Sequence, residues 1–336
     1  MKALVVGGSG YTGGELIRIL LGHPKVGDVE AMSRSHAGKP ASEIHPNLRG
    51  IFDKKFLEHD PCKTDADVAF LALPHGQSME YAPKLLESGV KVVDLSADYR
   101  IRDAGLYERY YVKHKNPELL EKAVYGLPEL FRNDIKGCGL VANPGCYATA
   151  AILSLAPMRD FKGKMDLRVI VDAKSGTSGA GAKPTEFLHH SEVDGNLKPY
   201  KVVGHRHQPE IEHILGRLIP GVSVSFTPTL APTARGILSN AHVFCDTTAA
   251  DLAEHYRRRY GRERFVRLVD TACTKNVLYS NYCDISVHYD GEKKRAVLIA
   301  AMDNLVKGAA GQAVQNMNLM MGYGEDEGLK TAPYHP

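Results

Sequence analysis

A glycine-rich turn at residues 7–14 constrains the fold of this chain more than any other feature. It follows a short apolar, β-branched run at residues 2–6 and precedes a helix pattern at residues 15–21, which Gly22-His23-Pro24 ends. The turn reads Gly7-Gly8-Ser9-Gly10-Tyr11-Thr12-Gly13-Gly14. Glycines spaced in this way permit a tight turn, close approach of the backbone to a pyrophosphate, and close packing of the helix on the strand. The chain is therefore predicted to contain a dinucleotide-binding unit, with the phosphates at the helix N-terminus.

Strand and helix patterns alternate through the next part of the chain. Apolar runs at residues 29–32, 67–73 and 90–95 predict strands, and residues 78–88 predict a helix. Alternation at this spacing predicts an α/β fold with a parallel, doubly wound sheet of the Rossmann type.

Beyond residue 146 the pattern changes to longer strands separated by polar loops, which predicts an α+β domain with a large mixed sheet. The predicted strands are residues 166–173, 222–226, 235–244, 282–289 and 296–301, and the predicted helices are residues 209–218, 249–260 and 303–321. A chain of 336 residues is long enough for two domains. We expect a dinucleotide-binding domain over residues 1–146, completed by a C-terminal helix over residues 304–336. The second domain, over residues 147–303, is expected to serve catalysis, substrate binding and self-association.

The residues after the second predicted strand distinguish between two dinucleotides. NAD, with a free ribose 2′-hydroxyl, usually meets Asp or Glu at this position. Here the chain has Ser33-Arg34-Ser35, and two hydroxyls with a guanidinium suit a 2′-phosphate. We therefore predict NADP; the alternative is that Arg34 is a solvated loop residue and the preference is relaxed. The expected cofactor contacts in this domain are Gly7, Ser9, Gly10, Tyr11, Thr12, Gly13, Ser33, Arg34 and Ser35.

Cys146 lies between a strand pattern and a helix pattern, directly after Asn143-Pro144-Gly145. A thiol in the first turn of a helix is close to the positive end of the macrodipole and to backbone N–H groups, which favour the nucleophilic thiolate. A single cysteine is more often a small buried hydrophobic residue, but the Asn-Pro-Gly turn favours the reactive interpretation. Together with the dinucleotide turn, Cys146 predicts covalent capture of an acyl group beside a nicotinamide.

Two histidines lie just before a predicted helix, in Gly204-His205-Arg206-His207-Gln208-Pro209-Glu210. A thioester mechanism needs a proton shuttle that titrates near neutrality, which imidazole provides. Single histidines are usually structural, and the chain has 15 of them. The clustering in one short polar segment nevertheless favours a catalytic role for at least one of His205 and His207.

Two further stretches directly follow predicted strands. The loop Ser175-Gly176-Thr177-Ser178-Gly179-Ala180-Gly181 is expected to pack its backbone against a ligand, the alternative being a flexible linker. Arg100, in Asp94-Leu95-Ser96-Ala97-Asp98-Tyr99-Arg100, lies beyond the C-terminal end of a parallel strand, where doubly wound sheets bind ligands. An arginine there holds a phosphate through two hydrogen bonds; the alternative is an ion pair with Asp98 or another carboxylate.

Composition and charge exclude several classes of protein. The net charge is only +3, without a clustered basic stripe, so we expect no nucleic-acid partner and no membrane-surface partner. No apolar run approaches the roughly 20 residues that span a bilayer, and the start of the chain lacks a signal-peptide pattern. The six cysteines form no C-x-x-C pair and no ligand-like spacing with histidine. We therefore expect reduced thiols, no metal and a cytoplasmic protein.

In this order, over nearly the whole chain, the motifs resemble those of the N-acetyl-γ-glutamyl-phosphate reductases, the arginine-pathway branch of the semialdehyde dehydrogenase superfamily. The matching segments are residues 7–14, 94–100, 143–147, 175–181, 205–210, 227–230 with 235–236, and 303–308. The resemblance implies an enzyme of arginine biosynthesis that uses NADPH to reduce an acyl phosphate, N-acetyl-L-glutamyl 5-phosphate, to the semialdehyde, with release of phosphate.

The resemblance also implies roles for individual residues. Cys146 matches the nucleophile that forms a thioacyl intermediate, and His207 matches its acid–base partner, with His205 close to it. Cofactor positions beyond the glycine turn are Ser175, Gly176 and Asn304, and substrate-binding positions are Arg100, Asn143, Ser96 and Glu210.

Three alternatives stay open. Close relatives act on an aminoadipyl or glutamyl phosphate attached to a small acidic carrier protein. Aspartate-semialdehyde dehydrogenase has the same chemistry, although the Asn-Pro-Gly-Cys-Tyr and His-Arg-His segments argue against it. A non-catalytic NADP sensor is a rival of another class, but it would be expected to lack Cys146 or the histidine pair. A small-molecule substrate and a homo-oligomer, either dimer or tetramer, are expected in the preferred reading.

Overall fold

The contacts of the chain divide the described residues into two units. The structure is a computed structural model that describes residues 1–58, 60 and 62–335. The first unit contains residues 1–145 together with residues 309–330, and the second contains residues 146–308 with the tail from residue 331. The expected roles of the two domains stay predictions. Residues 59, 61 and 336 of their predicted ranges lie outside the described residues.

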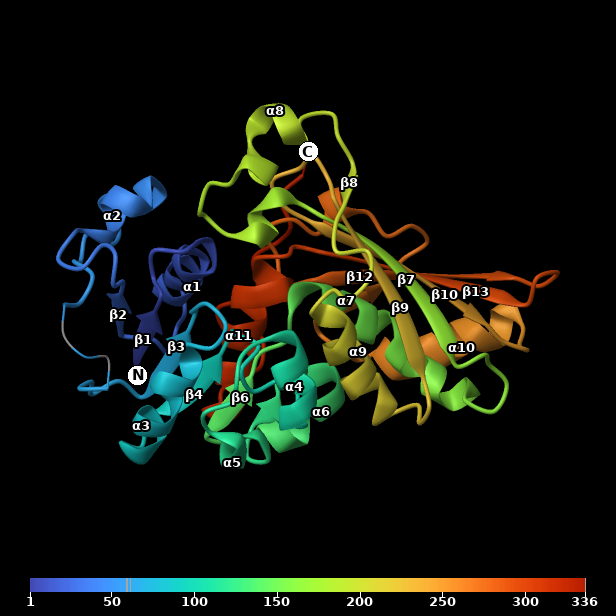
Figure 1. The fold of residues 1–336 in the computed structure, drawn as a ribbon, viewed down its shortest axis with the longest axis horizontal. Coiled ribbons are helices and arrows are strands. Elements are labelled where there is room, and N and C mark those ends of the chain that lie inside the picture. Colours follow the sequence, from blue (N-terminus) through green and yellow to red (C-terminus); the bar gives the residue numbers. More distant parts are fainter. Residues whose placement is uncertain (59, 61, 336) are drawn as a thin grey trace. The chain divides into compact units, whose positions relative to one another are not determined.

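The first unit has a parallel sheet, drawn in blue to green in Figure 1. Among the described residues its strand order is β2-β1-β3-β4-β6-β5, and every neighbouring pair is parallel. The strands are β1 (Lys2–Val6), β2 (Asp28–Met32), β3 (Val68–Leu71), β4 (Lys91–Asp94), β5 (Val124–Tyr125) and β6 (Leu140–Ala142). This order, with β1 beside both β2 and β3, confirms the predicted Rossmann-type sheet.

Helices of the first unit pack on this sheet. Helix α1 (Tyr11–Leu21) begins after Gly10, buries Leu16, Ile17 and Leu20, and ends at Gly22. Helix α11 (Gly311–Met320) is buried along its whole length and packs against α1 and α6, although it is remote from both in the sequence. The other helices of the unit are α2 (Ala41–Ile44), α3 (Ala82–Glu87), α4 (Ala104–Tyr110), α5 (Pro117–Leu120) and α6 (Pro128–Ile135).

The predicted C-terminal helix is shorter than expected and is interrupted. Asp303 and Asn304 precede a π-helix, Val306–Ala310, and only then does α11 begin. The described residues beyond Met320, 321–335, are not helical, so the prediction of a helix over the whole of residues 304–336 was wrong. The carboxylate of Asp303 accepts hydrogen bonds from the N–H groups of Leu305 and Val306, which redirects the start of this segment.

The second unit has a mixed sheet of longer strands (Figure 1). In the part of the chain that the structure describes, the strand order is β11-β12-β13-β10-β7-β9-β8. The strands are β7 (Arg168–Ser175), β8 (Lys198–Pro199), β9 (Ser223–Leu230), β10 (Ile237–Phe244), β11 (Val266–Leu268), β12 (Cys283–Asp290) and β13 (Arg295–Met302). Two pairs, β7 with β9 and β11 with β12, are parallel and the others are antiparallel. The predicted mixed sheet is confirmed.

Helices of the second unit pack on this sheet. Helix α7 (Cys146–Leu155) contacts β10 and β13, α9 (His207–Gly216) contacts β9, and α10 (Ala249–Tyr260) contacts β11 and β12; α8 (His190–Val193) is a single turn. Along β7 the side chains alternate, with Val169, Val171 and Ala173 buried and Ile170 half-exposed. No helix in the described residues is both long enough and apolar enough to cross a membrane.

Candidate active site

Cys146 is the first residue of α7 and is partly exposed, whereas every other residue of that helix is buried. A helix with little amphipathic character forms here because Ala148, Ala151 and Ile152 pack into the core of the second unit. The Asn-Pro-Gly turn ends the preceding strand and starts the helix at the cysteine. The thiol therefore combines a helix N-terminus with access to solvent, the combination that makes a cysteine reactive.

The two predicted histidines lie together beside the residue that follows the cysteine. The ring centroids of His205 and His207 are 5.1 Å apart, and each lies 5.8 Å from the ring of Tyr147. His207 is the first residue of α9, and both imidazoles are largely buried. The structure thus brings together side chains that are about 60 residues apart in the sequence.

The two histidines differ in how they are held. Burial, with smaller contributions from the positive charges of Arg206 and Lys201, lowers the pKa of His205 to about 4. The backbone N–H of His207 donates to Nδ1 of His205 over 3.2 Å, so the proton of a neutral His205 ring is on Nε2. His205 is therefore a neutral hydrogen-bond donor near pH 7, poorly matched to a role as proton shuttle.

Two tyrosines that the sequence reasoning did not single out contribute to the same cluster. The hydroxyl of Tyr200 donates to that of Tyr147 over 3.4 Å, and the Tyr200 ring lies 5.5 Å from the ring of His205. Burial is the main cause that raises the pKa of Tyr200, and the charge of Cys146 adds to it. Tyr147 was detectable because it follows the cysteine directly, but Tyr200 lies in a loop with no sequence signal.

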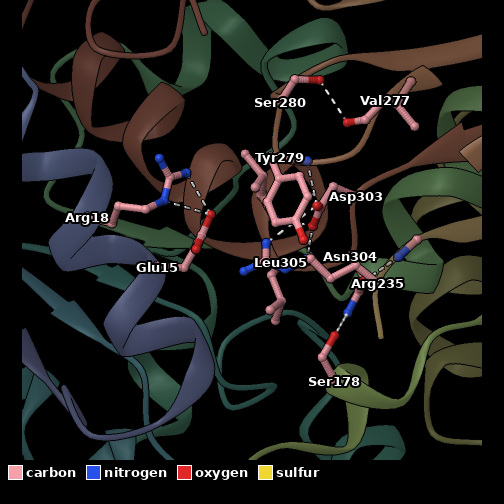
Figure 2. A network of polar contacts seen from close by, with 12 residues as sticks. Glu15, Arg18, Ser178, Arg235, Val277, Tyr279, Ser280, Asp303, Asn304 and Leu305 are labelled. Atoms are coloured by element: carbon pink, nitrogen blue, oxygen red, sulfur yellow. Dashed lines mark hydrogen bonds and ion pairs between the residues drawn. The ribbon is translucent and has the colours of Figure 1, made fainter. Parts of the chain in front are cut away.

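The side chain of Asn304 contacts the loop after β7. The Asn304 carbonyl accepts from the backbone N–H of Gly236 over 2.8 Å, and its amide donates to the Ser178 hydroxyl over 2.9 Å (Figure 2). Ser175 is buried at the end of β7, and its hydroxyl donates to the carbonyl of Gly176 over 3.1 Å. A Cβ on Gly176 would lie 2.7 Å from the backbone nitrogen of Arg235, so this position needs a glycine. The loop that contains the predicted Ser175 and Gly176 is therefore joined to Asn304 by the hydrogen bond to Ser178. Glu210 is buried one turn after His207 in α9.

The glycine turn of the first unit has the close backbone packing that a dinucleotide needs. The N–H groups of Gly7 and Gly8 both donate to the carbonyl of Met32, over 3.0 and 2.8 Å. A Cβ on Gly7 would lie 2.2 Å from the carbonyl oxygen of Ala72, and one on Gly13 would lie 2.4 Å from that of Gly7. Gly10 is the N-cap of α1, and Tyr11 and Thr12 follow as its first residues, Tyr11 being exposed. This cradle, which side chains would fill, fits a dinucleotide phosphate at the helix N-terminus.

The residues predicted to distinguish NADP from NAD lie beside this turn. The hydroxyls of Ser9 and Ser33 are 2.8 Å apart, and that of Ser35 lies 3.4 Å from Ser33. The Arg34 side chain is 58% exposed, and its guanidinium is 3.3 Å from the Glu80 carboxylate. The guanidinium also lies 5.4 Å from the centroid of the Tyr81 ring. Arg34 is thus partly solvated and held against Glu80 and Tyr81.

The three substrate-binding positions predicted in the first unit form one buried hydrogen-bonded cluster at the ends of β4 and β6. Arg100 donates from Nε to the carbonyl of Asn143 and from Nη2 to that of Leu95, each over 2.7 Å. The Asn143 side chain accepts from Asn316 over 2.9 Å and donates to the carbonyl of Ala309 over 3.2 Å. Arg100, Asn143 and Ser96 are all buried. They hold the start of the turn that leads to Cys146.

The carboxylates near this cluster have other partners. The Ser96 hydroxyl donates to Asp94 over 2.8 Å. Asp98 accepts from the N–H groups of Gly76 and Ser78 and from the Tyr107 hydroxyl. Burial, followed by the charge of Asp98, raises the pKa of Asp94. This carboxyl pair ties the segments that follow β3 and β4 to each other.

Two family models match successive parts of the chain. The model described as the NAD binding domain of semialdehyde dehydrogenase matches residues 2–138, and the model described as its dimerisation domain matches residues 146–304. Together they cover most of the chain and show that a nicotinamide dinucleotide is the cofactor.

Several curated proteins are similar over the full length. An N-acetyl-gamma-glutamyl-phosphate reductase of Archaeoglobus fulgidus is 47% identical, covering 100% of both chains. One of Methanopyrus kandleri is 49% identical over 99% of this chain and 98% of the relative. A Saccharolobus solfataricus protein named [LysW]-L-2-aminoadipate/[LysW]-L-glutamate phosphate reductase is 45% identical over 100% of this chain and 99% of the relative.

Solved structures share the fold at lower sequence identity. Aspartate semialdehyde dehydrogenase II of Vibrio cholerae superposes with a TM-score of 0.72 at 18% identity, over 96% of this chain and 98% of the other. An aspartate semialdehyde dehydrogenase of Candida albicans, solved with NADP, has a TM-score of 0.68 at 17% identity, over 95% of this chain and 98% of the other. At such identities the comparison supports the two-part architecture and not a substrate.

Proposed function

The chain belongs to the semialdehyde dehydrogenase family, and from that membership we propose that it is an NADP-dependent N-acetyl-γ-glutamyl-phosphate reductase of arginine biosynthesis in the cytoplasm. The observation that carries the proposal is Cys146, partly exposed at the start of an otherwise buried helix and next to the tyrosine that the histidine pair surrounds. The names of the relatives that are 47–49% identical over the whole chain support the substrate.

In the proposed first step, the Cys146 thiolate attacks the acyl carbon of the acyl phosphate. The C–S bond forms as the C–O bond to phosphate breaks, which leaves a thioacyl enzyme and free phosphate. Backbone N–H groups at the start of α7 are the proposed donors to the developing oxyanion. Arg100 is the proposed phosphate contact, with Ser96, Asn143 and Glu210 shaping the substrate site.

For the second step, the glycine turn would hold a nicotinamide dinucleotide, which when bound would supply a hydride to the thioacyl carbon. The resulting thiohemiacetal oxyanion re-forms a carbonyl as the C–S bond breaks, which releases the aldehyde and returns Cys146 to the thiolate. His207 is the proposed acid–base residue: its imidazolium would protonate the oxyanion as it forms, and its imidazole would take that proton back as the carbonyl re-forms. Burial lowers the pKa of the neighbouring His205 to about 4, so His205 stays neutral. It orients the start of α9 by accepting a hydrogen bond from the His207 N–H.

The preference for NADP is proposed on the hydroxyls of Ser33 and Ser35 and the guanidinium of Arg34 after β2. Neither serine nor arginine carries the negative charge that would repel a 2′-phosphate, and Arg34 keeps more than half of its side chain accessible. The glycine turn, Ser175, Gly176 and Asn304 are the other proposed cofactor contacts.

The covalent step is tested by a phosphate burst. Without NADPH, the wild-type enzyme mixed with the acyl phosphate is expected to release a rapid burst of one phosphate per active site, because the thioacyl enzyme accumulates. Cys146→Ser is expected to lose the burst. Cys138→Ser is the matched control and is expected to keep it, because Cys138 is half-buried and burial raises the pKa of its thiol to about 11. A full burst from Cys146→Ser contradicts the covalent route.

A carrier-linked substrate is the second candidate, favoured by the 45% identity with the Saccharolobus protein. The two are separated by phosphate-dependent reduction of NADP with free N-acetylglutamate semialdehyde or with the carrier-linked aldehyde. We expect the free aldehyde to be used with the higher kcat/KM; the opposite order assigns the chain to the carrier-linked branch.

A non-catalytic sensor is separated by alkylation. We expect iodoacetamide to modify Cys146 faster than the exposed Cys273, and the acyl phosphate to slow that reaction. Equal rates at the two cysteines favour the sensor.

Self-association is also proposed. The second unit matches the model described as a dimerisation domain, and its sheet leaves apolar side chains such as Ile170 and Phe244 half-exposed. We propose a homo-oligomer formed through this sheet; a sedimentation experiment that finds only the monomer at working concentration contradicts it.

A further inference from the structure

Gly308 packs directly against the proposed nucleophile. A Cβ on Gly308 would lie 2.8 Å from the Cβ of Cys146 and 3.2 Å from Cε of Met302. Real side chains do not approach so closely, so the position accepts only a hydrogen. The backbone at Gly308 therefore forms one wall of the space in which the Cys146 side chain lies.

Asp303 holds Gly308 in this place through its backbone and its carboxylate. The N–H of Gly308 donates to the Asp303 carbonyl over 2.9 Å. One carboxylate oxygen accepts from the N–H groups of Leu305 and Val306, over 2.8 and 3.1 Å. The turn from Asp303 to Gly308 includes the first residues of the π-helix, and π-helical turns frequently occur at functional sites.

The other carboxylate oxygen of Asp303 is held by two groups from distant parts of the sequence (Figure 2). It accepts from the backbone N–H of Tyr279 over 2.8 Å and lies 3.4 Å from the Arg235 guanidinium. Asp303 is 0% exposed, and a buried carboxylate needs hydrogen-bond and ion-pair partners of this kind to offset the loss of water. Arg235 also lies 4.7 Å from the centroid of the Tyr279 ring, which fixes the plane of the guanidinium.

Tyr279 adds evidence that this arrangement is under constraint. Its φ of +62° is in the left-handed region, which a bulky residue rarely adopts. Such a conformation persists where surrounding contacts over-determine it, and here the bond to Asp303 and the contact with Arg235 do so.

We propose that Asp303 and Arg235 are positioning residues for Cys146. Their ion pair holds the turn of residues 303–308, and that turn sets Gly308 against Cys146 so that the sulfur has one orientation. The inference rests on the proposed nucleophilic role of Cys146. It gives a function to Arg235, which the sequence motif contained without a role. Because a nucleophile displaced by about 1 Å loses on the order of 10²-fold in rate, small changes in this turn are expected to have large kinetic effects.

The test compares two arginines in the same kind of environment. Arg267 pairs with the buried Asp284 over 2.6 Å and lies 4.6 Å from the centroid of the Tyr282 ring. Its hydrogen-bond partners in the described part of the chain, Asp284 and the carbonyl of Asn276, lie outside the turn of residues 303–308. Arg235→Gln and Arg267→Gln therefore remove similar interactions from the same unit. Both are expected to lower the melting temperature by a similar amount.

Only Arg235→Gln is expected to change the nucleophile. The rate of Cys146 alkylation by iodoacetamide, followed by peptide mass spectrometry with Cys273 as internal reference, is expected to fall on the order of 10²-fold. The midpoint of its pH profile is expected to move upward, because a displaced sulfur loses the favourable end of the helix. kcat is expected to fall with it, with little change in KM. Arg235→Lys, which keeps the charge, is expected to recover part of the loss.

Gly308→Ala is the second variant, since it acts on the wall directly and leaves the ion pair in place. It is expected to show the same alkylation defect while the variant stays folded. Folded Arg235→Gln and Gly308→Ala proteins whose Cys146 alkylation matches that of Arg267→Gln overturn the proposal. Alkylation uses no substrate, so this result is independent of the phosphate burst that tests the proposed function.

Discussion

The glycine turn and the cysteine site differ in how far apart in the sequence their residues lie. The turn is built mainly from residues 7–14, which pack against the carbonyls of Met32 and Ala72, so its geometry depends on which backbone positions lack a side chain. The cysteine site brings Cys146 and Tyr147 together with His205, His207 and Tyr200 from a distant segment. The geometry of the glycine turn is encoded mainly by residues adjacent in the sequence. The cysteine site exists only when the sheet and helices of the second unit are packed.

The largest effect is expected from His207→Asn, which breaks the cysteine site alone. kcat is expected to fall on the order of 10²–10⁴-fold because the proposed acid–base residue is removed, while NADPH affinity stays close to that of the wild type. Steady-state kinetics and fluorescence titration of NADPH measure the two quantities. His190→Asn, an exposed histidine of α8, is the control. An unchanged kcat moves the role to His205.

The next effect concerns pH and the long-range packing around His205. The unfolded imidazole binds a proton below about pH 6.5, whereas the folded one does so only below its pKa of about 4. The free energy of unfolding is thus expected to decrease by on the order of 3 kcal/mol as the pH falls from about 6.5 to 4. His205→Asn is expected to flatten this decline in urea titrations. The same slope in both proteins shows that other groups govern acid stability.

A smaller effect is expected when the local geometry of the glycine turn is broken. Gly13→Ala places a methyl group 2.4 Å from a backbone oxygen, whereas Gly10→Ala meets its nearest atom at 3.7 Å. Gly13→Ala is expected to lower the free energy of unfolding by about 2 kcal/mol more than Gly10→Ala. Denaturant titration measures the difference. Equal stability of the two variants would mean that the turn relaxes freely.

The smallest effect refines the cofactor preference. Arg34→Glu is expected to weaken NADPH binding on the order of 10-fold while NADH binding changes little, because a charge-assisted contact with the 2′-phosphate is replaced by repulsion. Arg49→Glu, at an exposed arginine of the same unit, controls for net charge. Equal losses for both dinucleotides contradict the assignment of the 2′-phosphate.

Much of the fold was predictable because its strands are apolar runs with clear ends. The exceptions have physical reasons. Strand β9 continues through Pro228 to Leu230, past the end expected at residue 226, because it pairs with β7 along its whole length. Helices α4 to α6 have eight residues or fewer, too few to show a clear helical period in the sequence. Asp103 caps α4 by accepting from the Leu106 N–H, a signal that was available.

The candidate site was predictable only in part, because some of its contacts join segments that are far apart in the sequence. Cys146 and the histidine segment stand out by residue type and turn context. The sequence does not indicate that Tyr200 lies against Tyr147 or that Gly308 lies against Cys146, although residues 303–308 form a matching motif. These two contacts join segments separated by 50 residues or more. Arg100 and Asn143 were chosen as ligand contacts. The structure adds that Arg100 donates to the backbone carbonyl of Asn143, just before the cysteine, and that the Asn143 side chain donates to the carbonyl of Ala309.

By itself the sequence determined the local devices of this protein: the glycine turn, the helix that starts at Cys146, and the polar residues in place of an acidic one after β2. Each depends on backbone freedom or on a residue type within a few positions, which the linear order specifies. Only the tertiary structure decided which histidine is held neutral and which wall confines the nucleophile. Burial and contact are properties of packed surfaces, and those surfaces come from segments that only the folded sheet brings together.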